Sequence, residues 1–298
     1  MNNNQEIKKS IKNGWKYLES QNISGFFECM VGSSRGLSDG LSSPPETSNI
    51  LIEEVLLKYH PRRNISKDTI KYLKKLSNNE LFTYFEDRSL YPPDSDFNAI
   101  GYSLLFELGY ANTKEANIIL NILLSNIDEN GIVNVWITNS DRPKRIDHVV
   151  ATNVIYLAYL LGREKETIVS EDWIYNILVN NEYQKGSRYY NSPDAFLFAL
   201  SRLTSKFPLF NERFNKPLRE HVENRIKEVE FIIDIAMLII VAKSLDIPVD
   251  YYQNKLINMQ NDDGSWQSDA LFRFGSVNKY FGSQALTTAY AIRSLEIY

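Results

Sequence analysis

The sequence is poor in cysteine, histidine, glycine and proline. Its 298 residues include one cysteine, Cys29, and three histidines. A lone cysteine excludes an intrachain disulfide and a cysteine-rich zinc module, and three histidines leave little for a histidine-based metal site. We therefore expect no metal held by side chains. With only 13 glycines and 10 prolines, few residues interrupt regular structure, which favours long helices.

The chain also lacks an excess of positive charge and a long apolar run. A net charge of −4 argues against the basic surface that phosphate backbones require, so nucleic acid is not an expected partner. The first residues, MNNNQEIKKSIKN, contain no apolar segment typical of a secretory signal, and a cytoplasmic location is the expectation. The longest apolar run, residues 231–242, contains Asp234 and is too short to span a bilayer.

Apolar residues instead recur at helical spacing along the whole chain, and strand-like alternation is scarce. No linker-like segment divides the sequence, so we expect one domain over residues 1–298 and an all-α fold. The predicted helices cover residues 5–21, 46–60, 66–79, 94–110, 113–127, 147–163, 168–181, 192–205, 213–228, 230–246, 248–261 and 283–298.

The predicted helices alternate between two kinds. Segments such as residues 99–109 and 149–162 are apolar nearly all round, as buried inner helices should be. Segments such as residues 5–20 and 67–80 carry one apolar stripe and a charged face, as outer helices do. The inner helices recur about every 47 residues, a spacing typical of helix-hairpin repeats. Six such hairpins predict an (α/α)6 toroid, in which an outer ring of helices surrounds an inner ring.

The predicted long connections nearly all run from an outer helix to the next inner helix. In a closed toroid these connections, and the amino ends of the inner helices, lie on one rim. We therefore expect the functional site at that mouth. The connections cover residues 22–45, 80–93, 128–146, 182–191 and 262–282.

One motif recurs where outer helices end. Gln260 is followed by Gly264 and Trp266, and Gln21 is followed by Gly25 and an aromatic residue at the same spacing. The glycine is predicted to end the helix in a left-handed conformation, and the aromatic ring to pack over the helix end. This interpretation makes each motif a stabilising corner.

The segment Q-x-x-D-G-S-W at residues 260–266 resembles the QW motif of the squalene-hopene cyclase, class II terpene cyclase and prenyltransferase β-subunit superfamily. Residues 91–99, 147–154 and 281–289 are similar to segments of short bacterial proteins with squalene-cyclase repeats. The resemblance implies an α/α toroid. It implies a reaction less directly, because the same fold also serves protein prenylation, complement-like proteins and carbohydrate enzymes.

Asp94-Ser95-Asp96-Phe97 matches the D-x-D-D motif of class II terpene cyclases at its first three positions. In that family the middle aspartate protonates an alkene or epoxide, so the resemblance implies that Asp96 is the general acid. Phe97 stands where the last aspartate is expected. A structural alternative remains open, in which Asp94 caps a helix and Asp96 interacts with the helix dipole.

The topology places further candidates at the mouth. Asp147 and His148 begin the third inner helix, where the imidazole could bind or reprotonate the acid, and Asp194 begins the fourth, with a capping signal. Arg273 is a candidate contact for a diphosphate. Capping, packing and surface charge are the structural alternatives for all of these. Aromatic candidates for stabilising a carbocation are Phe97, Trp136, Tyr189, Tyr190, Trp266 and Phe281.

The leading hypothesis is therefore a class II terpene cyclase-like enzyme that cyclises a linear isoprenoid by protonation. No cofactor is required, except that a diphosphate substrate would bring Mg²⁺. Two alternatives stay open: a non-catalytic toroid that binds an apolar ligand or protein, and a carbohydrate enzyme that uses carboxylates at the mouth. A homodimer is a further hypothesis because the chain supplies one toroid, and an apolar substrate suggests peripheral contact with a membrane.

Overall fold

The computed structural model describes residues 3–43, 48–77, 80–83, 91–138, 143–275 and 277–296. Its α-helices are α1 (Asn3–Gln21), α2 (Ser48–Val55), α3 (Asn64–Ser77), α4 (Ser95–Glu107), α5 (Thr113–Ser125), α6 (His148–Leu160), α7 (Ile168–Val179), α8 (Asp194–Lys206), α9 (Pro208–Arg225), α10 (Ile232–Ser244), α11 (Asp250–Asn258) and α12 (Gln284–Leu295). Short 3-10 helices cover Leu57–Tyr59, Glu164–Thr167 and Glu182–Lys185.

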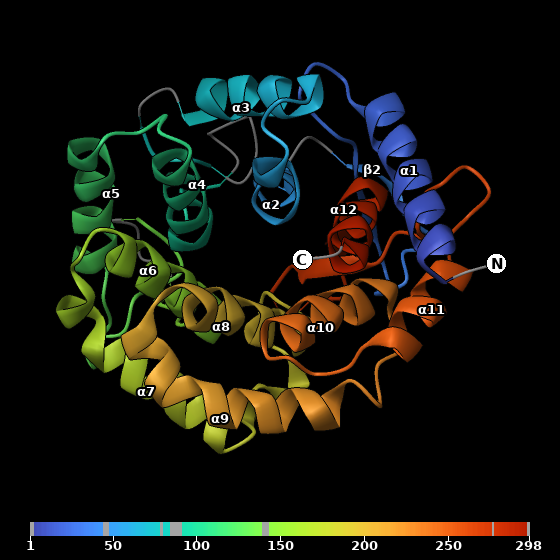
Figure 1. Cartoon of the computed structure of the whole chain (residues 1–298). Helices are drawn as coiled ribbons and strands as arrows, with labels where there is room; N and C mark the ends of the chain where they lie inside the picture. The colour runs from blue at the N-terminus through green and yellow to red at the C-terminus, as the bar shows by residue number, and fades with distance from the viewer. Residues whose placement is uncertain are drawn as a thin grey trace.

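The even-numbered helices form an inner ring, because their surfaces are apolar on nearly every side. Each packs against the next, and α12 packs back against α2, which closes the ring. The odd-numbered helices lie outside, with one face buried and one in solvent (Figure 1). This arrangement is the (α/α)6 toroid that the alternation predicts. The almost complete burial of α4, α6 and α10 follows from their apolar composition.

Each of the twelve predicted segments corresponds to an observed helix, with differences at the ends. Residues 46–47, 78–79 and 297–298, which the predictions include, lie outside the described residues. Helix α9 begins at Pro208 rather than at residue 213, because proline is tolerated in the first turn of a helix. Among the described helices, none combines the length and the hydropathy needed to cross a membrane.

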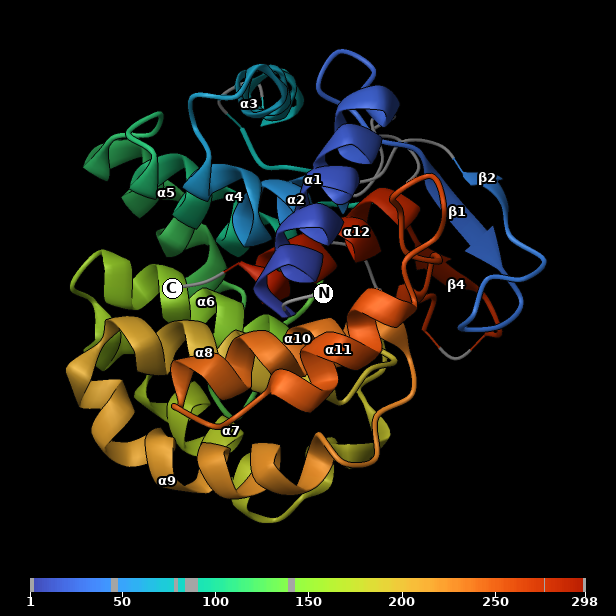
Figure 2. The same cartoon turned by 45° about the vertical axis from the view of Figure 1, so that its right-hand side comes forward.

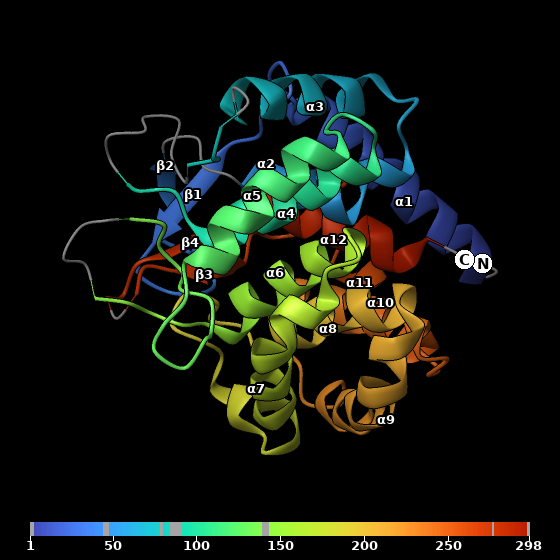
Figure 3. The same ribbon diagram turned by 90° about the vertical axis from the view of Figure 1, so that its left-hand side faces the viewer.

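A small antiparallel sheet was not predicted from the sequence. It contains β1 (Cys29–Gly32), β2 (Leu41–Ser43), β3 (Ala270–Arg273) and β4 (Tyr280–Gly282), in the order β2-β1-β4-β3. Val31 pairs with Leu41 on one side and with Phe281 on the other. Strands of three or four residues are too short to show a periodicity. The sheet lies at one end of the toroid, opposite the two chain termini (Figures 2 and 3).

The glutamine and tryptophan motif forms a corner, although its glycine does not end the helix. Helix α11 ends at Asn258 with Met259 as its C-cap, and Gly264 lies in the turn that follows, with φ of +90°. A Cβ on Gly264 would lie 2.5 Å from the carbonyl oxygen of Asn13 in α1. Gln260 donates from Nε2 to the carbonyl oxygen of Ser10, also in α1. The motif therefore fastens outer helix α11 to its neighbour α1.

Candidate active site

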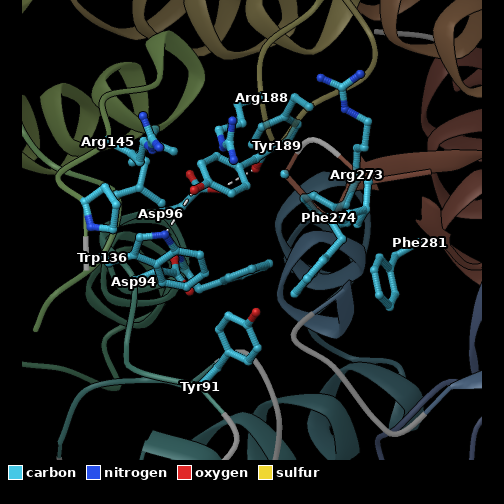
Figure 4. Close-up of a pocket in the computed structure, with 18 residues that line it drawn as sticks. Tyr91, Asp94, Asp96, Trp136, Arg145, Arg188, Tyr189, Arg273, Phe274 and Phe281 are labelled. Atoms are coloured by element: carbon cyan, nitrogen blue, oxygen red, sulfur yellow. Dashed lines mark hydrogen bonds between the residues drawn. The ribbon is translucent and has the colours of Figure 1, made fainter. Parts of the chain in front are cut away.

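A cavity of about 320 Å³ lies at the end of the toroid that carries the sheet, since Phe272 of β3 and Phe281 of β4 line it. Its wall combines the first turns of α4 and α6 with the connections that precede α4, α6, α8 and α12. Two carboxyl groups, those of Asp94 and Asp96, lie in this wall (Figure 4). The aromatic residues that line it are Tyr91, Phe97, Trp136, Tyr189, Tyr190, Phe272, Phe274 and Phe281.

Local sequence fixes the position of both carboxyl groups. Asp94 is the N-cap of α4, and its Oδ1 accepts a hydrogen bond from the Phe97 amide at 2.8 Å. Ser95 donates from its amide to the carbonyl oxygen of Val135 and from Oγ to that of Asn134. These bonds attach the start of α4 to the segment that follows α5. Asp96 is therefore held in the first turn of a helix that is buried almost all round.

Asp96 binds two side chains from other helices and connections. Its Oδ1 accepts from Nδ2 of Asn153 in α6 at 2.7 Å, and its Oδ2 accepts from the hydroxyl of Tyr190. Burial raises the pKa of Asp96 to about 6, although the hydrogen bonds from Tyr190 and Asn153 oppose that rise. The same two donors stabilise the carboxylate that remains once a proton has left. Asp96 is thus an acid that is half protonated near pH 6.

Asp94 is a weaker acid than Asp96. Burial, followed by the charge of Asp96, raises the pKa of Asp94 to about 8. Its Oδ2 has no hydrogen-bond partner among the described residues. The predicted cap is present, but burial and a neighbouring carboxylate outweigh the helix dipole, which alone would favour ionisation. Asp94 is therefore neutral at pH 7 and leaves Asp96 as the better proton donor.

Aromatic rings surround the space in front of these acids. Trp136 donates from Nε1 to the hydroxyl of Tyr189 at 3.0 Å, and Tyr91 packs 5.4 Å from the Trp136 ring. Phe97 lies 5.7 Å from Phe272. Such rings present negative faces to a cation, and each interaction contributes about 0.5–2 kcal/mol. The cavity is therefore suited to an apolar molecule that becomes positively charged.

Three arginines, Arg145, Arg188 and Arg273, also line the cavity. In Figure 4 they lie along the upper side of the view, with Tyr91 below. Within the described ranges, no carboxylate forms an ion pair with any of them. Arg273 donates to the carbonyl oxygen of Ser187 at 3.4 Å. The arginines can therefore bind an anionic group that enters with an apolar ligand.

Eight of the sequence candidates line this cavity, namely Asp94, Asp96, Phe97, Trp136, Tyr189, Tyr190, Arg273 and Phe281. Four others do not. His148 is buried, its ring packs edge-on against Phe196 at 4.8 Å, and burial lowers its pKa. Asp147 caps α6 by accepting from the Val149 amide at 2.9 Å. Neither residue lines the cavity, and no hydrogen bond joins the His148 ring to Asp96 within the described ranges, so the expectation that this imidazole binds the acid is wrong.

The side chains of Asp194 and Trp266 also make their contacts away from the cavity. Asp194 does not cap α8, because its carboxylate binds Arg225 at 3.0 and 3.2 Å while the Ser192 hydroxyl accepts from its amide. Trp266 is fully buried, and its Nε1 donates to the carbonyl oxygen of Leu256 in α11 at 2.8 Å. Both residues stabilise connections between helices and do not reach the cavity.

Sequence reasoning missed several residues around the site. Arg145, Arg188, Tyr91 and Phe274 lie in long connections, where no periodicity indicates which side chains face a cavity. Asn153 offered a better signal, because an amide inside the apolar segment VVATNVIYLA must find a buried partner. That partner is Asp96.

Comparison with known proteins shows similarity to terpene cyclases. Residues 55–161 match the model of the sesquiterpene cyclase astC-like C-terminal domain. Drimenol cyclase drtB of Aspergillus calidoustus is 26% identical over 209 residues, which are 69% of this chain and 38% of the relative. The matched region thus spans about two fifths of the length of that curated relative.

The fold is similar to that of the type II terpene cyclase MstE from Scytonema. The TM-score is 0.74 at 13% identity, with 98% of this chain and 97% of that chain covered. A variant of MstE in complex with its substrate, geranylgeranyl dihydroxybenzoate, gives a TM-score of 0.69 at 12% identity, with 98% and 97% covered.

The partial family match, the curated relative and the fold are thus all similar to terpene cyclases of the class II type. The resemblance found in the sequence points to the same group of proteins.

Proposed function

We propose that this chain cyclises a linear isoprenoid, with Asp96 as the general acid. The observation that supports the proposal most strongly is a buried carboxyl group, held by Tyr190 and Asn153, in the wall of an aromatic cavity. Burial keeps Asp96 protonated at higher pH than an exposed aspartate would be. The two hydrogen bonds then stabilise the conjugate base.

The reaction would begin with transfer of the Asp96 proton to the less substituted carbon of a terminal alkene, or to the oxygen of a terminal epoxide. The π electrons form the new C–H bond, or the epoxide C–O bond breaks, and a tertiary cation results. Internal double bonds attack this cation in turn, and each attack forms one C–C bond. Loss of a proton from carbon, or capture of water, ends the sequence. Tyr91, Trp136 and Phe272 present rings that stabilise the cations on the way.

The arginines indicate a substrate with an anionic head group, such as a diphosphate or a carboxylate. Arg145 and Arg188 would bind that group while the apolar tail reaches Asp96. Among the described residues, no cluster of three or more histidines, cysteines and carboxylates could hold a metal ion. If the head group is a diphosphate, Mg²⁺ would enter bound to it.

Product analysis tests the proposal. The purified protein is incubated with farnesyl diphosphate, geranylgeranyl diphosphate, squalene and geranylgeranyl dihydroxybenzoate, each with and without Mg²⁺. We expect a cyclised product from at least one of them, and its loss in Asp96→Asn. Asp172→Asn, at a side chain that is 59% exposed, is the matched control and should keep full activity. Cyclised product that persists in Asp96→Asn would refute the role of Asp96.

The same experiment separates the two alternatives. Phe97 in place of a third carboxylate is the feature that favours a non-catalytic toroid. Binding of these isoprenoids without turnover would support that function. A carbohydrate enzyme is less compatible with the cavity, because sugar hydroxyls need many more polar partners than its largely aromatic wall offers.

A homodimer and peripheral membrane contact are further proposals. Sedimentation of the purified protein tests the first, and flotation with lipid vesicles tests the second.

A further inference from the structure

A row of buried polar side chains leads away from Asp96 through the inner ring of helices. Asn153 in α6 donates from Nδ2 to Asp96, and its Oδ1 accepts from Nη1 of Arg202 in α8 at 2.8 Å. The Nε of Arg202 lies 2.9 Å from Oε1 of Glu54 in α2, with which it forms an ion pair. Four inner helices thus contribute one residue each to a continuous polar line.

The chemistry of Arg202 determines how the Asn153 amide is oriented. A guanidinium group carries only donors, so the Asn153 atom that faces it must be the oxygen. The amide nitrogen must then face Asp96 Oδ1, to which it can only donate. If the amide were reversed, two donors would meet at Arg202 and the Asn153 oxygen would face Asp96.

This orientation also distinguishes the two oxygens of Asp96. Oδ1 accepts the amide hydrogen, which suits the unprotonated carbonyl oxygen of a neutral acid. The transferable proton is therefore favoured on Oδ2, because the Tyr190 hydroxyl that contacts this oxygen can rotate to accept a hydrogen bond, whereas the amide nitrogen of Asn153 cannot. The reversed amide would instead accept a proton from Oδ1 and stabilise the neutral acid, which weakens it as a donor.

We propose that Arg202 is a positioning residue for the cyclisation: it locks the Asn153 amide so that Asp96 keeps its proton on Oδ2 and releases it readily. The inference rests on the proposed function, since it assumes that Asp96 donates a proton. Arg202 cannot act by touching the substrate. It lies outside the wall of the mouth cavity, and it lines a separate cavity at the opposite end of the toroid.

The surroundings of Arg202 keep it in place. Its guanidinium carbon lies 4.3 Å from the centre of the Tyr156 ring, and Glu54 is also bound by Lys58 at 2.8 Å. Other titratable groups also interact electrostatically with Asp96, so that the pKa of one or the other is changed. These groups are Asp94, Asp147, Tyr190 and Tyr290. None of these four contacts the Asn153 amide through a hydrogen bond within the described ranges.

Infrared spectroscopy measures the effect directly and needs no substrate. The carboxyl C=O band that disappears in Asp96→Asn is assigned to Asp96, and its loss with rising pH gives the pKa of that group. In Arg202→Met we expect this pKa to rise by about one unit, because a positive charge and a locked donor are both lost. The band itself should shift, because the C=O of Asp96 loses its amide donor.

Two variants separate this role from a general loss of structure. Glu54→Gln weakens the same ion pair but keeps the bond from Arg202 to Asn153, so it should move the Asp96 pKa less than Arg202→Met does. In an Asn153→Ala background, Arg202→Met should leave the position of the C=O band unchanged, since the amide through which it acts is gone. If Arg202→Met does not fold, Arg202→Gln replaces it. Glutamine offers Asn153 either an oxygen or a nitrogen, so it no longer fixes the orientation of the Asn153 amide.

Kinetics provide the second readout. Arg202→Met should lower kcat about tenfold and leave KM unchanged, because substrate contacts are intact and only proton donation is weakened. An unchanged Asp96 band and pKa in a folded Arg202 variant would overturn the inference, and so would an equal band shift in the Asn153→Ala background. If the spectra respond as expected while no isoprenoid is turned over, the inference on Asp96 holds and the proposed function fails.

Discussion

Replacing Tyr190 with phenylalanine isolates one hydrogen bond to the proposed acid. Tyr190 is buried, and its hydroxyl is the donor to Oδ2 of Asp96. Phenylalanine keeps the ring that packs 5.1 Å from Phe272 and removes only the hydroxyl. The Asp96 carboxylate then loses one of its two stabilising donors.

The size of the effect follows from the bond that is lost. A hydrogen bond to a charged group contributes about 1.5–3 kcal/mol, and one pKa unit corresponds to about 1.4 kcal/mol. We therefore expect the pKa of Asp96, which lies at about 6 in the wild type, to rise by about one to two units in Tyr190→Phe. The acid must be protonated to react, so the rate falls as pH rises through this pKa.

The assay is the initial rate of cyclisation between pH 4.5 and pH 9. In Tyr190→Phe the pH at which the rate falls to half of its maximum should rise by about one to two units, as the pKa of Asp96 does. The maximal rate at low pH should decrease, because a weaker acid donates its proton less readily. Asp172→Asn is the control for which neither change is expected. If the rate of Tyr190→Phe falls to half of its maximum at the same pH as that of the wild type, the reasoning about Asp96 is refuted.

Three further predictions concern stability and binding. The pKa of Asp94 is raised from 3.8 to about 8 in the folded protein, so the folded state loses stability relative to the unfolded state as pH rises between those values. Asp94→Asn, which cannot ionise, should therefore raise Tm more at pH 8 than at pH 5. Gly264→Ala should cost about 2–4 kcal/mol in urea unfolding, through φ of +90° and the contact with Asn13. Gly109→Ala, with φ of +74° and nothing within 4 Å, should cost about 1 kcal/mol. Arg188→Gln should raise KM about tenfold for a substrate with an anionic head and leave kcat unchanged.

The fold could be predicted further than the site could. Apolar residues at helical spacing identify all twelve helices, and the contrast between α4, which is apolar all round, and α3, which has one charged face, indicates which ring each belongs to. The sheet could not be predicted, because its strands of three or four residues pair only across segments far apart in sequence, such as Met30 with Gly282.

The site, like the sheet, is built by contacts between residues far apart in sequence, which limits its prediction. The motif at Asp94 and Asp96 predicted the two carboxyl groups of the cavity wall. It could not indicate that Tyr190, 94 positions along the chain, contacts Asp96. His148 was misplaced because a position at the start of an inner helix does not determine the direction of its side chain, which points to Phe196.

Solvent isotope labelling tests the central claim most directly. The carboxyl proton of Asp96 exchanges with solvent, so a reaction run in D₂O must place one deuterium on the carbon that Asp96 protonates. We predict that the product cyclised from an alkene is heavier by one mass unit, with the label on the less substituted carbon of the former terminal double bond, and that Asp96→Asn forms none of it. A cyclised product without deuterium, or a labelled product formed by Asp96→Asn, would contradict proton-initiated cyclisation by this acid.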